Sequence, residues 1–146
     1  MQTFLPYESF SESGKCLDYK RLGKQRVEAY QILRALTGES KGWINHPATK
    51  MWKGYEWQLY LYGLAVCQEW RNRGYKDTVR DKLFYMMAGE RHRAYPNRIP
   101  SWLGGPIHAS HRAALLAKNF DYYKQFNWIE EPKIEYIWPS KNLYTI

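Results

Sequence analysis

WKGYEWQLYLYGLAVCQEW, residues 52–70, is the segment from which we predict the central helix of the fold. Its apolar and aromatic residues recur at steps of three or four, which places them on one face of an α-helix. These residues are Trp52, Tyr55, Leu59, Tyr62, Val66 and Trp70. Proline suits the first turn of a helix and glycine its end, so we expect this core helix to start near Pro47 and to stop at Gly74.

The same periodicity predicts three further helices. The first runs from about residue 15 to 36, with Gly23 as a weak point that costs ~1 kcal/mol relative to alanine. Its apolar residues are Leu22, Val27, Ala29, Tyr30, Ile32, Leu33 and Leu36. A shorter helix follows Asp77, with Val79, Leu83, Phe84 and Met87 on its buried side. Another runs from about residue 108 to 120.

The remaining segments lack a helical period. Residues 1–13 read as an extended arm, 89–107 as a long basic loop rich in proline and glycine, and the residues from 122 onward as an aromatic tail. We therefore expect an all-α fold, a compact bundle of about three to four helices. The length of 146 residues suits a single domain spanning 1–146.

Composition points to an anionic partner. Lys and Arg number 22 against 14 Asp and Glu, which gives a net charge of +8, and 17% of the residues are aromatic. Aromatic side chains beside cations stack on unpaired bases as well as filling a core. No apolar run is long enough to span a membrane and no signal peptide is evident, so we expect a cytoplasmic protein. Cys16 and Cys67 form no CxxC unit, Cys67 lies in an apolar helical stripe where we expect a reduced core thiol, and neither cysteine is assigned any chemistry.

One carboxylate lies in a basic stripe on the first predicted helix. Arg21, Lys24, Glu28 and Gln31 are spaced to share a face opposite the apolar side. This spacing would place an acid where a DNA backbone is attracted. The alternative is a solvated face on which Lys24 and Glu28 form a weak ion pair.

Two other clusters are candidate DNA contacts. His108, Ser110, His111 and Arg112 open the last predicted helix, where free backbone N–H groups favour a phosphate. The histidines could instead bind a metal with His46 or His92, but their spacing without a cysteine or an HExxH pattern is a weak metal signal.

The second of these clusters is GWINHP, residues 42–47, which places an aromatic side chain ahead of two hydrogen-bonding ones. Trp43 could be a wedge that stacks on bases or a lid on the core, and Asn45 and His46 could contact DNA.

Taken in order, these segments resemble the pyrimidine-dimer DNA glycosylase/AP lyase family. The resemblance covers LDYKRLGKQRVEAYQIL (17–33), NHPATKMW (45–52), CQEWRNRGY (67–75) and IHASHRAALLAKNFDYYKQF (107–126). It implies a helical enzyme without metal or cofactor that acts, as a monomer and away from membranes, on damaged double-stranded DNA. It also implies a bacterial or viral, nucleoid-associated location.

The resemblance further implies which residues react. The family's nucleophile is the main-chain amine at the N-terminus, and an α-amine is partly neutral near pH 7. Here that amine belongs to Met1, or to Gln2 if Met1 is removed, although a residue as bulky as Gln2 normally leaves the methionine in place. Glu28 matches the family's essential acid/base glutamate, and Arg26 matches its neighbouring arginine.

Three other functions are compatible with the sequence. The chain could be a non-catalytic DNA-binding module in which Glu28 merely pairs with Lys24, or a glycosylase for another modified base. A metal-dependent nuclease using His108 and His111 is the third. Only the glycosylase/lyase predicts a covalent complex that borohydride can trap at the N-terminal amine.

Overall fold

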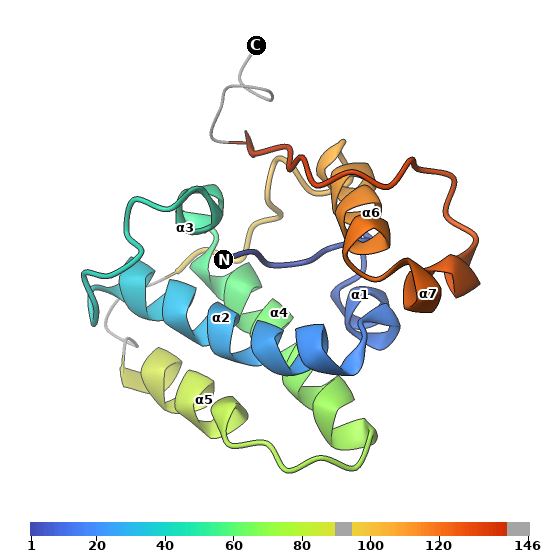
Figure 1. The fold of residues 1–146 in the computed structure, drawn as a ribbon. Coiled ribbons are helices and arrows are strands. Elements are labelled where there is room, and N and C mark those ends of the chain that lie inside the picture. Colours follow the sequence, from blue (N-terminus) through green and yellow to red (C-terminus); the bar gives the residue numbers. More distant parts are fainter. Residues whose placement is uncertain (90–94, 140–146) are drawn as a thin grey trace.

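The computed structural model describes residues 1–89 and 95–139 (Figure 1). Its helices are α1 (Phe10–Cys16), α2 (Tyr19–Thr37), α3 (Pro47–Trp52), α4 (Glu56–Asn72), α5 (Val79–Gly89), α6 (Ile107–Lys118) and α7 (Phe120–Tyr123), followed by the short 3-10 helix η1 (Lys124–Phe126). The expected all-α class is confirmed. In the described ranges, however, there are seven α-helices rather than three or four.

Helices α2 and α4 pack against each other and supply the centre of the core (Figure 1). The fully or nearly fully buried side chains on these two helices include Leu22, Ala29, Ile32, Leu33, Leu59, Tyr62, Val66 and Trp70. Gly23 lies at the crossing, where a Cβ would come 3.0 Å from the ring of Trp70. The residue expected to weaken α2 therefore makes room for the close approach of α4.

The predicted core helix is two helices. α3 begins at Pro47 as expected, and His46 caps it by accepting a hydrogen bond from the Ala48 N–H at 3.0 Å. It stops at Trp52, because Gly54 adopts a left-handed conformation with φ of 87° and turns the chain before α4. Gly74, with φ of 91°, follows the end of α4 as predicted.

Three other expectations about the helices are corrected. The extended arm ends earlier than predicted, because Ser9 accepts a hydrogen bond from the Glu12 N–H at 3.1 Å and starts α1 within it. Val27 and Phe84, expected on buried faces, are exposed. On α5, Val79 and Leu83 are buried as expected, and Met86 completes the buried side.

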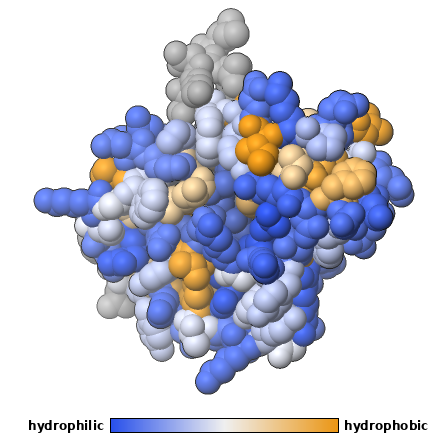
Figure 2. Space-filling model, in the orientation of Figure 1, coloured by the Kyte–Doolittle hydropathy of each residue, from blue (hydrophilic) through white to orange (hydrophobic). Residues whose placement is uncertain are grey.

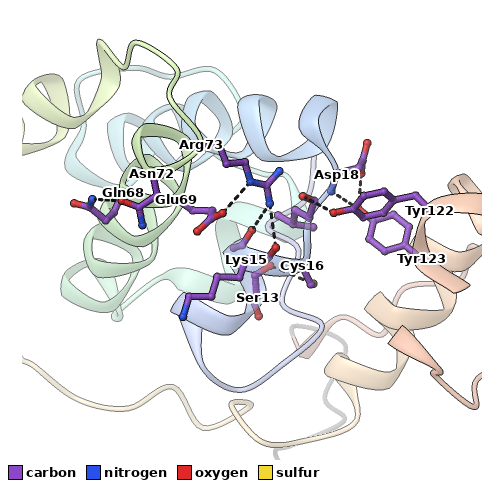
Figure 3. A network of polar contacts seen from close by, with 12 residues as sticks. Ser13, Lys15, Cys16, Asp18, Gln68, Glu69, Asn72, Arg73, Tyr122 and Tyr123 are labelled. Carbon is purple, nitrogen blue, oxygen red and sulfur yellow. Dashed lines mark hydrogen bonds and ion pairs between the residues drawn. The ribbon is translucent and has the colours of Figure 1, made fainter. Parts of the chain in front are cut away.

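A network of polar contacts joins α1, α2, α4 and α7 (Figure 3). Arg73 donates from Nε to Glu69 Oε2 at 2.8 Å and from a terminal nitrogen to the Lys15 carbonyl at 3.0 Å, so the last carbonyls of α1 are tied to α4. Asp18, just before α2, binds the Tyr123 hydroxyl of α7. Cys16 and Cys67 are both buried free thiols, as expected.

The tail after η1 runs along α6 and covers the N-terminal segment (Figure 1). The Lys133 N–H donates to the Ala113 carbonyl at 3.0 Å, and Trp128 Nε1 donates to the Tyr7 hydroxyl at 3.0 Å. The described part of the basic loop, residues 95–106, contains no helix, as predicted, while residues 90–94, which include His92, lie outside the described ranges. None of the described helices combines the length and apolar character needed to cross a membrane.

Candidate active site

Residues 2–6 form an extended segment whose backbone is bound by buried side chains instead of by a neighbouring strand. Gln25 of α2 makes two of these bonds: its Oε1 accepts from the Phe4 N–H at 2.8 Å, and its Nε2 donates to the Gln2 carbonyl at 2.9 Å. The Tyr62 hydroxyl of α4 donates to the Phe4 carbonyl at 2.8 Å. Buried backbone groups need such partners, so these bonds fix the position of the segment.

Two histidines of α6 hold the next residue. The Leu5 N–H donates to His111 Nδ1 at 2.9 Å, and His108 Nδ1 lies 2.7 Å from the Leu5 carbonyl. Because His108 Nε2 accepts from the Gly104 N–H at 2.8 Å, the proton of a neutral His108 is on Nδ1 and is donated to Leu5. Burial lowers the pKa of His108, and burial lowers the pKa of His111 to about 3. Both rings are therefore neutral near pH 7 and suited to these bonds.

Arg112 and Ser110 are also used inside the protein. Arg112 makes two hydrogen bonds of 3.0 Å with the carboxylate of Glu130, and a third nitrogen donates to the Pro6 carbonyl at 2.8 Å. The Ser110 hydroxyl accepts from the Ile137 N–H at 3.2 Å. These residues at the start of α6 therefore anchor the N-terminal segment and the tail, and a phosphate contact by them stays a prediction.

The segment ends in a pocket of about 260 Å³ that Met1 and Glu28 line together. Glu28 is only 6% exposed. Its Oε2 accepts from Gln25 Nε2 at 3.0 Å and from the Gln2 N–H at 3.3 Å, while its Oε1 lies 3.8 Å from Lys24 Nζ. A buried carboxylate is thereby oriented beside the N-terminus.

Cations surround this carboxylate. The charged residues that line the pocket are Lys20, Arg21, Lys24, Glu28 and Lys118, and the uncharged ones are Met1, Gln2, Phe4, Gln25 and Tyr136. Lys20, Lys24 and Lys118 are exposed, whereas Arg21 pairs with Asp18 at 3.2 Å. Figure 2 shows this face as hydrophilic over most of its centre, where α2 runs. Such a surface attracts a phosphate backbone.

The predicted site residues fall into two groups. Arg21, Lys24 and Glu28 lie together as their spacing suggested, and Met1 and Gln2 join them. Arg26 lies elsewhere, because its guanidinium pairs with Asp77 and covers the ring of Trp70 at 4.4 Å.

The residues of the GWINHP turn, which precedes α3, lie outside the lining of this pocket. Trp43 and Asn45 are exposed, and His46 is half-buried. Trp43 is therefore not a lid on the core.

Five residues that line the pocket were not predicted from the sequence: Phe4, Lys20, Gln25, Lys118 and Tyr136. Gln25 was hidden because a glutamine within a polar run is ordinarily solvated, and its partners are backbone atoms 21 and 23 residues away. Lys118 and Tyr136 come from the end of α6 and from the tail, and no local pattern connects them to α2. In residues 1–89 and 95–139, no group of three or more His, Cys, Asp or Glu side chains is placed to hold a metal ion.

Comparison with known proteins identifies the family. A family model described as pyrimidine dimer DNA glycosylase matches residues 1–83 of the 146 residues. No curated protein and no solved structure matches the chain. The family match includes the N-terminal segment and the whole of α2, and hence every pocket residue except Lys118 and Tyr136. The chain belongs to the pyrimidine dimer DNA glycosylase family.

Proposed function

We propose that this protein is a DNA glycosylase with AP-lyase activity on damaged pyrimidines, such as cyclobutane dimers, in duplex DNA. The observation that carries the proposal is the anchored N-terminal segment, which brings Met1 into one pocket with the buried Glu28. An amine nucleophile needs a fixed position and a nearby group that accepts its proton. The presence of Met1 and Glu28 in the lining of one pocket supports these two roles.

The reaction uses the N-terminal amine as the nucleophile. The neutral amine attacks C1′ of the damaged nucleotide, and the bond from C1′ to the base breaks with its electron pair leaving on the base, which takes a proton. The new C1′ ammonium gives a proton to Glu28, which passes it to the sugar ring oxygen as the ring opens to an imine. Glu28 then removes a C2′ proton, the 3′ phosphate leaves, and water hydrolyses the imine.

Access favours Met1 as the residue that carries this amine. Gln2 is 4% exposed and its main-chain nitrogen is already hydrogen-bonded to Glu28, whereas Met1 is more exposed and lines the pocket. If Met1 were removed, the amine of Gln2 would lie 3.3 Å from Glu28 Oε2, within hydrogen-bonding distance of the carboxylate. The mass of the N-terminal peptide distinguishes the two.

The cations at the pocket supply the affinity for DNA. The exposed side chains of Lys20, Lys24 and Lys118 can contact phosphates on either side of the damaged nucleotide, and this attraction is independent of DNA sequence. Turning a nucleotide out of the stack costs a few kcal/mol and least at a lesion, which contributes to selectivity.

Replacing the carboxylate tests the role of Glu28. Glu28→Gln keeps the shape of the side chain and acceptors for its two hydrogen bonds, so DNA affinity should persist while single-turnover cleavage of a dimer-containing duplex nearly disappears. Glu56→Gln is the matched control, because Glu56 is also buried but binds the Gly54 N–H, away from the pocket lining. Wild-type cleavage by Glu28→Gln would refute the assigned role.

A further inference from the structure

The turn before α3 presents an aromatic side chain to solvent in an unusual conformation. Trp43 is 52% exposed and its neighbour Ile44 is 50% exposed. The backbone of Trp43 has φ of 64°, in the left-handed region that a bulky side chain rarely adopts. Exposure of two adjacent large apolar side chains on a turn is unfavourable in water unless a partner covers them.

A row of rings connects this turn to the pocket. Trp43 contacts His46 with ring centres 5.7 Å apart, His46 contacts Trp138 at 6.0 Å, and Trp138 contacts Tyr136 at 5.6 Å. Tyr136 lines the pocket with Met1 and Glu28. The exposed ring of Trp43 is therefore the outermost of four rings in contact, and the innermost ring, that of Tyr136, lines the pocket.

The N-terminal amine is also close enough to affect His46. Burial lowers the pKa of His46, and the positive charge of the N-terminus lowers it further. In Figure 1 the N-terminus lies beside α3, which the turn precedes. The turn is therefore close to the N-terminus, which lines the pocket.

We propose that Trp43, with Ile44 beside it, inserts between base pairs of the bound duplex and keeps the damaged nucleotide turned toward the pocket. The proposal rests on the proposed function. Proteins that bend DNA commonly insert an apolar side chain into a base step, which compensates for the stacking that the duplex loses. The ring of Trp43 stacks on the exposed bases, and Ile44 covers apolar surface next to it.

The position of Trp43 distinguishes it from other exposed aromatic residues. Phe84 is 55% exposed, about as much as Trp43, but it belongs to α5, which packs on α2 and α4 and lies on the other side of α2 from α3 (Figure 1). No chain of ring contacts in the described residues joins it to the pocket. Phe84 is thus the control for loss of an exposed ring.

The test compares borohydride trapping on an abasic-site duplex with trapping on the same strand left single. Trp43→Asn removes the ring and places there a residue that tolerates the left-handed backbone, whereas Trp43→Phe keeps a ring. Trp43→Asn should slow trapping on the duplex by about tenfold or more, and Trp43→Phe should restore much of the rate. Both variants should match wild type on the single strand, which needs no opening, and Phe84→Asn should match it on both substrates.

Two results would overturn the insertion of Trp43: an unchanged duplex rate in Trp43→Asn, or an equal loss on duplex and single strand. If wild type itself forms no adduct on either substrate, the proposed chemistry fails and the wedge is tested separately. For that purpose 2-aminopurine is placed next to the abasic site. Wild type should raise its fluorescence by unstacking it and Trp43→Asn should not, and an equal rise with both proteins would refute the wedge.

Discussion

Replacing Gln25 by Met measures what the anchored N-terminal segment contributes. Methionine has a similar shape but lacks the amide group, so the Phe4 N–H and the Gln2 carbonyl each lose the Gln25 partner, and Glu28 Oε2 loses one of its two donors. A buried polar group left unpaired costs about 1–3 kcal/mol, which for two groups gives about 2–6 kcal/mol. Because domains unfold with about 5–15 kcal/mol, the cost is large enough to release the segment while the core persists.

In Gln25→Met the rate of DNA cleavage should fall more than the affinity for DNA. Misplacing a reactive group by about 1 Å costs on the order of 100-fold in rate, so cleavage by Gln25→Met should fall by about that factor. The cations on α2 and α6 remain, so affinity for damaged duplex should change little. The assay combines hydrogen exchange at the Phe4 amide, single-turnover cleavage and DNA binding at a temperature well below unfolding.

Gln58→Met is the matched control. Gln58 is also buried, but its Nε2 donates to Asn97 Oδ1 at 2.6 Å rather than to the N-terminal segment. This variant should keep slow exchange at Phe4 and wild-type cleavage. Should Gln25→Met itself show slow exchange at Phe4 and a wild-type rate, the segment is held without Gln25 and the reasoning is refuted.

Three further predictions concern pH, charge and packing. Burial lowers the pKa of His111 to about 3, whereas an unfolded histidine titrates near about 6.5. The unfolded chain therefore binds a proton first as the pH falls, so the free energy of unfolding is full above about pH 6.5 and declines toward pH 3 by at most about 4–5 kcal/mol. Urea unfolding should show this loss, and a smaller loss in His111→Gln. Arg112→Ala should lower the free energy of unfolding by about 1–3 kcal/mol and leave the slope of log DNA affinity against log salt concentration unchanged. Lys24→Ala should reduce this slope by about 1. A reduced slope in Arg112→Ala would indicate that Arg112 contacts a phosphate. Gly23→Ala should lower the melting temperature, because its methyl group would lie 3.0 Å from an atom of the Trp70 ring. Gly14→Ala should raise the melting temperature, because the nearest atoms to its methyl group would lie 3.7 Å away. Shifts of the same sign in both variants would contradict the packing argument.

Local periodicity predicted the parts of the fold that periodicity controls. The apolar stripes of α2 and α4 identified the core, and helical spacing correctly grouped Glu28 with Arg21 and Lys24. The sequence did not predict the break between α3 and α4 at Gly54, because the spacing of aromatic residues continues through it. The backbone of Gly54 nevertheless adopts φ of 87° and turns the chain there. A glycine inside a periodic segment is compatible with both a continuous helix and a turn.

Contacts between distant parts of the chain explain the errors at the site. His108 and His111 read as surface residues at a helix start, but their partners on Leu5 are 103 and 106 residues away. Nothing in the spacing of α6 shows that an extended segment passes beside it. The sequence predicted an extended N-terminal arm but not its contacts, because the backbone of the arm is hydrogen-bonded by side chains of three distant helices.

Borohydride trapping on duplexes that carry an abasic site or a cyclobutane pyrimidine dimer, followed by mass spectrometry of the N-terminal peptide, shows whether the N-terminal amine is the nucleophile. We expect a covalent adduct on the amine of Met1, formed by the wild-type protein and nearly lost in Glu28→Gln. An adduct on Gln2 would move the nucleophile by one residue and keep the mechanism. Tight binding with no adduct on either substrate would contradict it and indicate a DNA-binding module or a glycosylase that uses water.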